Sequence, residues 1–498
     1  MEKLTVLRRL TFGSRIAEEE TDALSQYFVE TDAWAQVFGG AIDVVYGPKG
    51  SGKSALYSLL IAKREPLFDR GILLVAGENP RGATAFKGIT VDPPLTELEF
   101  TSLWKLYICC LLHAVLNEYD ITNQPATELG RILASTGLVK GSGSLAQLLA
   151  KVSAYVKRVI RPESVEGIVK FDPNTQLPVG VGAKINFSPD SQGDASGSTS
   201  VDRLLELANE AFTENGFTVW VLLDRLDVAF AEHEDLEANA LRALFRVYLD
   251  LMAHPQIKLK IFLRSDIWSR ITESGFREAS HITRTLTIEW NQSSLLNLVV
   301  RRAVYNNDLR DFYSVAITLP TAPLVEQEAF FYRLSPAQVE VGPNKSPTFG
   351  WVISRTTDGL KVVAPREVIH FFNRLREVQS QRLEVGGAQP EAEALFERGS
   401  YKEALPEVSK IRLEQTLYAE YPNLKQWLEK LRGARTKQSV ATLSSIWGVS
   451  SEEANSIAGN LARIGFFEVR GDRTEQVFWV PFLYRDGLDM RQGTEDLD

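Results

Sequence analysis

The chain alternates short apolar runs with longer segments in which apolar residues recur every three or four positions. The short runs contain β-branched residues and are bounded by glycine or polar residues, which is typical of buried strands. The longer segments have the spacing of helices with one apolar face. This alternation predicts an α/β fold, a mainly parallel sheet with helices on both faces. The expected strands span residues 41–46, 71–76, 217–223, 257–263 and 286–290, and the expected helices include 54–62, 100–118, 201–215 and 236–252.

The pattern changes twice along the chain. Residues 162–200 are dominated by Pro, Gly, Ser, Asp and Asn, which predicts a flexible insertion. After residue 291 the chain reads as mostly helical, with an amphipathic segment at 361–377 and a linker within 380–402. We therefore expect three domains: a core over 1–290, a helical lid and linker over 291–400, and a third domain over 401–498.

The third domain has a recognisable order of elements. A short helix over 442–447 is followed by a turn and by a second helix over 451–464. A hairpin follows, with one strand over 466–469 and the other over 476–480. Helix, turn, helix and hairpin in this order predict a winged-helix domain, which binds DNA or protein.

A phosphate-binding loop follows the first expected strand and precedes a helix. Its residues are Gly47-Pro48-Lys49-Gly50-Ser51-Gly52-Lys53-Ser54. Glycines let backbone N–H groups approach the phosphates, and the positive end of the next helix adds to the attraction. We expect the loop and Ala55 to bind ATP, with Lys53 on the β- and γ-phosphates and the Ser54 hydroxyl on Mg²⁺.

An acid is expected near that magnesium ion, at the end of a neighbouring strand. Asp224 ends the apolar run 219–223 and would hold Mg²⁺ through its water shell; capping of a helix is the alternative. Many such ATPases place a glutamate directly after this aspartate, but here Arg225 follows. Asp227 is the next acid, and either orients the attacking water or begins a helix. Hydrolysis is therefore expected to be slow, and binding without turnover stays open.

Another strand ends in Leu263-Arg264-Ser265-Asp266. An arginine at the carboxyl edge of an α/β sheet lies where such sheets bind ligands. Arg264 is a candidate sensor of the γ-phosphate, and a structural ion pair with Asp266 is the alternative.

Together these motifs resemble the STAND and KAP branch of P-loop ATPases, close to the AAA+ and origin-recognition ATPases. The resemblance rests on the phosphate loop, the acids Asp224 and Asp227, the strand-ending Arg264, the segment Ala364-Pro365-Arg366-Glu367, and the entry Phe28-Val29-Glu30-Thr31. It covers about residues 25–490. Arg225 departs from the pattern and puts fast turnover in doubt.

The resemblance implies a helical lid over the nucleotide. In that lid Arg366 matches a second sensing arginine, and Pro365 packs near the base. It also implies a homo-oligomer in which an arginine acts on a neighbouring subunit, with Arg277 or Arg284 in the right interval. The function it implies is an ATP-driven switch that controls assembly or an effector protein, in bacterial signalling or defence against phage.

Composition and charge limit the classes of function and the cellular location that we expect for the chain. The chain has 498 residues, 44% of them apolar, and a net charge of −9, which argues against a chain-wide nucleic-acid surface. Cys109 and Cys110 are adjacent and read as core residues in a reducing cytoplasm. The longest apolar candidate, 107–116, is half a membrane span, so we expect a cytoplasmic protein without a membrane anchor. The histidines lack metal-ligand spacing.

The charge of the third domain leaves its partner open. Residues 400–498 carry 13 Lys and Arg against 15 Asp and Glu, and the second helix of the domain opens with Glu452 and Glu453. Both facts favour docking to protein. A local basic patch nevertheless keeps a DNA-binding ATPase resembling replication initiators as the rival function. Its residues are Lys430, Arg432, Arg435 and Lys437.

Overall fold

The computed structural model groups the chain into two compact units. Residues 32–47 and 53–288 form one, which we call the sheet unit, and residues 1–31, 48–52 and 289–498 form the other, which we call the helical unit. The structure describes residues 2–14, 28, 31–79, 86, 96–138, 144–160, 200–226, 234–273, 275–471 and 476–494. Residues 162–199 of the expected insertion, residues 29 and 30 of the entry segment, and Asp227 lie outside these ranges.

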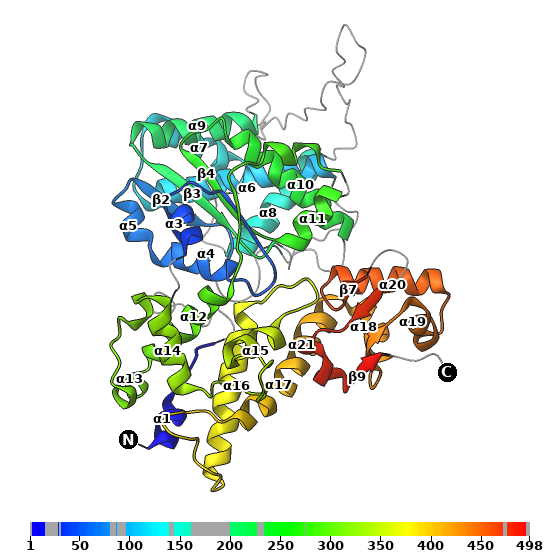
Figure 1. Cartoon of the computed structure of the whole chain (residues 1–498). Coiled ribbons are helices and arrows are strands. Elements are labelled where there is room, and N and C mark those ends of the chain that lie inside the picture. The colour runs from blue at the N-terminus through cyan, green and yellow to red at the C-terminus, as the bar shows by residue number, and fades with distance from the viewer. Residues whose placement is uncertain are drawn as a thin grey trace. The chain divides into compact units, whose positions relative to one another are not determined.

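A five-stranded parallel sheet organises the sheet unit, in the order β2-β3-β4-β1-β5 (Figure 1). The predicted α/β fold with a parallel sheet is confirmed. The strands are β1 (Val44–Gly47), β2 (Ile72–Ala76), β3 (Thr218–Leu223), β4 (Ile257–Arg264) and β5 (Thr285–Thr287).

Helices pack on both faces of this sheet. Val219, Val221 and Leu223 point to one face, where they share a core with α6, α9 and α10. Tyr57 of α4 packs edge-on against Phe262 of β4, at 5.8 Å between ring centroids. The helices of the unit are α3 (Asp32–Phe38), α4 (Lys53–Ala62), α5 (Arg64–Phe68), α6 (Glu97–Glu118), α7 (Gln124–Ser135), α8 (Leu145–Ile160), α9 (Val201–Glu214), α10 (Glu234–Leu251), α11 (Ser265–Glu273) and the 3₁₀ turn η4 (Arg277–His281).

The central helix α6 begins three residues before the expected start at 100 and ends at 118, as expected. It begins at a capping box between Thr96 and Glu99. Among the described residues it is the one helix long and apolar enough to cross a membrane, yet 72% of its most apolar window is buried within the fold. Cys109 and Cys110 lie on it as free, buried thiols, as expected, and burial raises the pKa of Cys110 to about 12.

The helical unit combines a helix bundle with a small sheet of order β7-β8-β6-β9. Its C-terminal elements follow the predicted order of helix, turn, helix and hairpin. The elements are α1 (Lys3–Arg9), α12 (Gln292–Tyr305), α13 (Asn307–Tyr313), η5 (Leu319–Thr321), α14 (Leu324–Leu334), α15 (Thr348–Thr356), α16 (Pro365–Glu384), α17 (Arg398–Arg412), the π-helix η6 (Leu413–Tyr418), α18 (Pro422–Glu429), β6 (Arg435–Gln438), α19 (Val440–Trp447), α20 (Ser451–Arg463), β7 (Glu468–Arg470), β8 (Val477–Trp479), α21 (Phe482–Arg485), η7 (Asp486–Leu488) and β9 (Arg491–Thr494).

One hydrophobic core runs through this unit from α1 to α21. Helix α16 continues to Glu384, and the segment between α16 and α17 buries Leu395 and Phe396 almost completely. The expected linker within 380–402 is therefore packed, because apolar side chains tie it to the bundle. The separation of a lid from a third domain at residue 401 stays a prediction.

Candidate functional site

The phosphate loop has the backbone that its glycines predict. Strand β1 ends at Gly47 and α4 begins at Lys53. Between them Gly50 has φ +81° and Gly52 has φ +101°, which side chains other than glycine rarely adopt. Nothing lies within 4 Å of the position that a Cβ at Gly52 would take. The loop thus turns sharply into the N-terminus of a helix, the arrangement that binds phosphate.

Lys53 holds the two ends of this loop together. Its ammonium group donates a hydrogen bond to the Gly47 carbonyl at 2.8 Å, and the residue is 9% exposed. In this position the side chain folds back along the loop, so its charge is available to a bound phosphate. Its charge also lowers the pKa of Asp266 in the same unit.

The middle of the loop, residues 48–52, packs within the helical unit. Lys49 forms an ion pair with Glu420, just after η6. The Trp290 indole donates to the Ser51 carbonyl at 2.8 Å. A Cβ placed on Gly50 would lie 3.2 Å from Cβ of Arg366 and 3.3 Å from Cβ of Ala364. The start of α16 thus lies against the loop residue where glycine is required.

Two buried polar atoms of the helical unit suit a phosphate ligand. Ser51 Oγ, in the loop, and Arg366 Nε, beside Gly50, are both buried without a hydrogen-bond partner among the described residues. Burying such groups unpaired costs about 1–3 kcal/mol each, and an anion supplies acceptors for an N–H or O–H donor. The residues present therefore fit a nucleotide phosphate. Pro365 forms the first turn of α16, where its missing N–H is tolerated.

Asp224 lies where the sequence analysis expects the magnesium acid. It directly follows β3 at the carboxyl edge of the sheet and is 3% exposed. Ser54 stands in the first turn of α4. A hydroxyl and a carboxylate are oxygen ligands of the kind that Mg²⁺ prefers. The next residue, Arg225, has a left-handed backbone with φ +56°, so the chain turns away directly after the acid.

Glu78 is an acid that the sequence analysis missed. The last register pair of β2 and β3 is Ala76 with Leu222, so Glu78 and Asp224 each lie two residues beyond it, at the carboxyl ends of adjacent strands. Glu78 is fully buried, and the Tyr57 hydroxyl donates to its carbonyl at 2.6 Å. Its carboxylate could not be found by motif, because the loop after β2 has no fixed spacing to the phosphate loop.

Arg264 adopts the pairing that was considered as the alternative to sensing. Its guanidinium donates two hydrogen bonds to Asp266, at 3.0 and 2.7 Å. Burial raises the pKa of Asp266, but the hydrogen bonds and charge of Arg264 outweigh that effect and hold it below its usual value. The position at the end of β4 is as predicted, and the sensing role stays a prediction.

The two candidates for an arginine acting in trans differ in their surroundings. Arg284 pairs with the buried Asp43 at 2.6 Å and also donates to the Gly40 carbonyl, before β1 begins. That is the edge of the sheet opposite the phosphate loop, so its contacts favour a structural role. Arg277 lies in η4.

All four residues of the expected basic patch are exposed, and at least two of them have partners within the helical unit. Lys430 donates to the Trp447 carbonyl at 2.6 Å, and Arg432 pairs with Glu429 and Asp489. Arg435 and Lys437 are exposed at alternate positions of β6.

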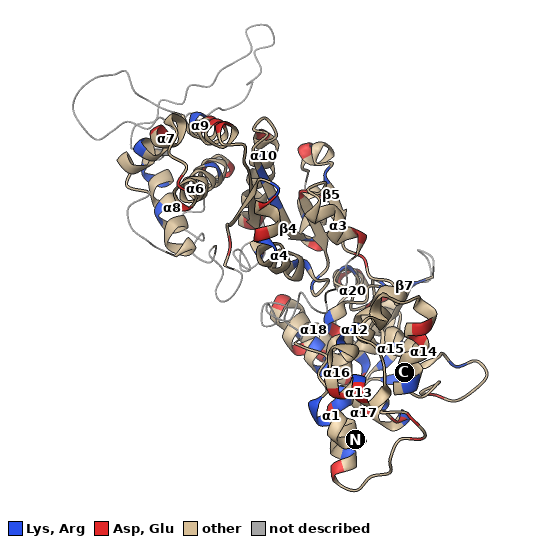
Figure 2. Ribbon diagram, turned by 90° about the vertical axis from the view of Figure 1, so that its left-hand side faces the viewer, with Lys and Arg blue, Asp and Glu red and all other residues tan. Residues whose placement is uncertain are grey.

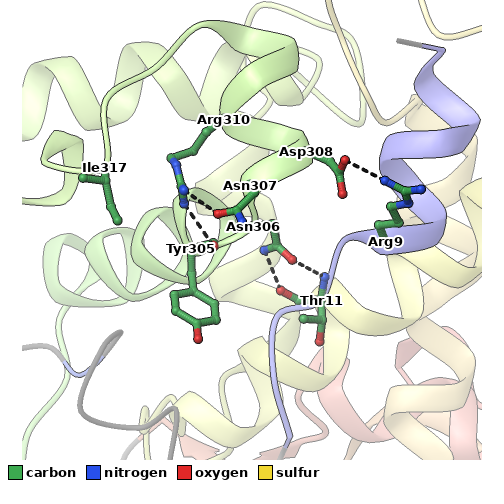
Figure 3. Close-up of a pocket in the computed structure, with 8 residues that line it drawn as sticks. All are labelled: Arg9, Thr11, Tyr305, Asn306, Asn307, Asp308, Arg310 and Ile317. Carbon is green, nitrogen blue, oxygen red and sulfur yellow. Dashed lines mark hydrogen bonds and ion pairs between the residues drawn. The ribbon is translucent and has the colours of Figure 1, made fainter.

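A separate pocket of about 420 Å³ lies near the start of the chain in the helical unit (Figure 3). Its polar groups are already paired: Arg9 with Asp308 at 2.9 Å, and Asn306 with the Thr11 backbone. It contains none of the predicted site residues. The lining residues are Arg9, Thr11, Tyr305, Asn306, Asn307, Asp308, Arg310 and Ile317.

Comparison with known proteins gives structural matches only. No protein-family model and no curated protein match the chain. The structure is similar to the Aeropyrum pernix ORC1 protein in complex with DNA, with a TM-score of 0.36, 12% identity and 96% of both chains covered. It is also similar to the A. pernix ORC2 protein in ADPNP-ADP complexes (TM-score 0.38, 10% identity, 96% of this chain and 94% of that one).

A third similar structure is CDC6P from Pyrobaculum aerophilum, with a TM-score of 0.29, 12% identity, and 97% of this chain and 98% of that one covered. At such TM-scores and identities the matches do not establish a family or a function for this chain.

Proposed function

We propose that this protein binds MgATP at the phosphate loop and hydrolyses it slowly. One observation carries the proposal: Gly50 and Gly52 take positive φ immediately before α4, which starts at Lys53. Positive φ at glycine, an exposed helix N-terminus and a lysine at the helix start are what phosphate binding requires. The buried, unpaired Ser51 Oγ and Arg366 Nε add two groups that a phosphate can satisfy.

Each residue has a role that follows from its place. Backbone N–H groups of Gly47 to Ala55 and the Lys53 ammonium group bind the phosphates. Ser54 and Asp224 would hold Mg²⁺, which supplies positive charge for phosphoryl transfer. Arg366, whose aliphatic stem lies beside Gly50, contacts the nucleotide through its guanidinium group.

Water must also be oriented for hydrolysis. Asp224 is followed by Arg225 and not by a glutamate, so the acid has to come from elsewhere. Glu78, which follows the strand next to that of Asp224, is the acid that the described structure favours, and Asp227 is the sequence-based alternative. This indirect arrangement is the reason to expect slow turnover.

Nucleotide binding is the first test. Lys53→Ala should abolish binding of a fluorescent ATP analogue, while Lys63→Ala, an exposed lysine just after α4, should bind as the wild type does. Equal affinity of all three proteins would overturn the proposal. Asp224→Asn should then remove the magnesium dependence of hydrolysis.

The wider role we propose is a molecular switch that assembles into a homo-oligomer and controls a partner protein in the cytoplasm. The support for this role is that the loop residues Lys49 and Gly50 contact helices of the helical unit. A phosphate bound to the loop would therefore change the contacts of those helices. The assignment to STAND-type ATPases and to anti-phage defence rests on the sequence motifs alone. ATP should change the mass measured by light scattering, and Lys53→Ala should abolish the change.

A DNA-acting ATPase is the second candidate, and the exposed basic residues of β6 favour it. A nucleotide-binding scaffold without turnover is the third, motivated by Arg225. The rate of phosphate release separates the three. For a DNA-acting ATPase, duplex DNA should raise the rate of phosphate release. For a scaffold without turnover, no phosphate should be released. For the switch, phosphate release should be slow and insensitive to DNA.

A further inference from the structure

One face of the small sheet in the helical unit is open to solvent and basic. Lys437 of β6 and Glu468 of β7 are both cross-strand partners of Trp479 on β8, so these three side chains share that face. Arg435 lies two residues before Lys437 on β6, and its cross-strand partner is Arg491 of β9. We call this surface the β6–β9 face.

The balance of charge on these strands departs from that of the whole chain. Within the four strands the basic residues are Arg435, Lys437, Arg470 and Arg491, all exposed, and the one acid is Glu468. Lys361 adds a further cation, since its ammonium group pairs with Glu468. The chain as a whole carries a net charge of −9, and basic and acidic residues are interspersed elsewhere along its helices (Figure 2). The face is therefore a local concentration of positive charge.

Trp479 packs against two guanidinium groups, those of the exposed Arg470 and the buried Arg485. The guanidinium carbon of Arg470 lies 4.0 Å from its ring centroid and that of Arg485 lies 4.6 Å away. Burial, together with the charges of Arg355 and Arg470, lowers the pKa of Arg485 to about 10, although the charge of Asp486 opposes the shift. In the described part of the chain, Glu468 is the acid within the four strands, and Asp486 lies near Arg485. The exposed cations of the strands outnumber these acids, which favours an anionic partner.

The helix that would read DNA in a winged-helix domain has the opposite character. Helix α20 begins with Glu452 and Glu453, both exposed. Two carboxylates at this end repel phosphates, so α20 is poorly suited to enter a groove of DNA.

We propose that the β6–β9 face binds the phosphate backbone of duplex DNA without reading its sequence. Charge complementarity selects a polyanion, since a protein gains affinity by releasing counterions from phosphates. Single-stranded nucleic acid is disfavoured because its binding uses bases stacked on aromatic rings, and Trp479 is already covered by two guanidinium groups. The inference deepens the DNA-acting candidate function, but binding through this face does not require ATP.

The test measures binding of the full chain to a short, fluorescently labelled duplex of mixed sequence, without nucleotide. The double variant Arg435→Ala/Lys437→Ala should bind about tenfold more weakly, and the slope of log K against log salt should fall by about two. The matched control is Lys402→Ala/Lys410→Ala, which removes two exposed lysines of α17 in the same unit and should bind as the wild type does. Equal losses in both variants would overturn the proposal.

A substitution that strengthens DNA binding is a useful second test, because a misfolded variant would not bind DNA more tightly than the wild type. Glu468→Gln removes the one acid of the strands and releases Lys361 and Arg470, so it should tighten binding several-fold. Glu452→Gln/Glu453→Gln removes twice the negative charge from α20 and should tighten binding less. A larger gain from the α20 variant, or stronger binding to single strands than to duplex, would show that the β6–β9 face is not the DNA site.

Lys53→Ala separates this inference from the nucleotide proposal. It should lose ATP binding and keep the affinity for duplex DNA in this assay. If the wild type binds ATP but not DNA, the inference on the β6–β9 face fails while the nucleotide proposal stands.

Discussion

Arg412 of α17 and Glu367 of α16 form a buried ion pair, with 3.0 Å between Nη1 and Oε1 and side chains 9% and 4% exposed. Glu367 follows Arg366, which lies beside Gly50 of the phosphate loop. Arg412 precedes η6, which leads to Glu420, the partner of Lys49. One ion pair therefore ties together the two segments that contact the loop within the helical unit.

Removing one partner of that pair should be costly. Arg412→Met leaves the Glu367 carboxylate buried without its counter-charge, and we expect a loss of about 3–5 kcal/mol of unfolding free energy. The double variant Arg412→Met/Glu367→Leu should recover part of this loss, because Glu367 no longer leaves a buried carboxylate, whereas the buried Asp358 still loses the nearby charge of Arg412. Urea unfolding followed by circular dichroism measures both, and equal losses in the two variants would contradict the assignment.

Gly52 should be required because its backbone has a positive φ, and not because a side chain there would collide with a neighbour. Gly52→Ala meets no neighbour within 4 Å but must keep φ near +101°. The strain of about 1–2 kcal/mol should weaken ATP binding by about tenfold. Gly459→Ala is the matched control in α20, where a Cβ also meets nothing. It should leave ATP binding unchanged and stabilise the helix by roughly 0.5–1 kcal/mol.

Glu78 should affect turnover more than binding. Glu78→Gln keeps the size of the side chain and removes its charge, so kcat should fall by about 10²–10⁴ while ATP affinity changes little. Asp227→Asn is the parallel variant, and Glu65→Gln, an exposed glutamate of α5, is the control. If Asp227→Asn loses turnover and Glu78→Gln keeps it, Asp227 is the residue that orients the attacking water.

Glu420 should weaken nucleotide binding in the wild type. Its carboxylate pairs with Lys49 of the loop and places a negative charge near the phosphates. Glu420→Gln should therefore tighten ATP binding about two- to fivefold, in line with the strength of a partly exposed ion pair. Isothermal titration with ATP measures this, and the effect should shrink at high salt. Weaker binding in Glu420→Gln would show that the pair positions Lys49 for the nucleotide.

The pairing of Asp266 with Arg264 sets its dependence on pH. The folded-state pKa of Asp266 is lowered, so its contribution to stability is complete above its ordinary value of 3.8 and is lost as the pH falls through the lowered value. Asp266→Asn should thus lower stability at neutral pH and flatten the acid limb of the stability curve. If Arg264 senses the γ-phosphate, the same variant should also increase the preference for ATP over ADP.

Local patterns predicted the elements of this chain well. The helix expected over 201–215 is observed as α9 and ends one residue earlier, because its period of apolar residues and its Ser200 cap are local properties. The strand expected over 41–46 begins later, at Val44, and Asp43 before it is buried in an ion pair with Lys260, a contact that no local pattern reveals. The packed segment after α16 was missed because Leu395 and Phe396 are buried by helices distant in sequence.

The sequence by itself determined the phosphate loop, its strand and helix, and the acid that ends β3, because each depends on residues that are neighbours in the chain. Only the tertiary structure brought Glu78 to the side of Asp224, Glu420 to Lys49 and Arg366 to Gly50. The same holds for the β6–β9 face, where Arg435 meets Arg491 across strands that are far apart in sequence. Such contacts depend on the pairing of strands and the packing of helices, which the spacing of residues along the chain does not encode.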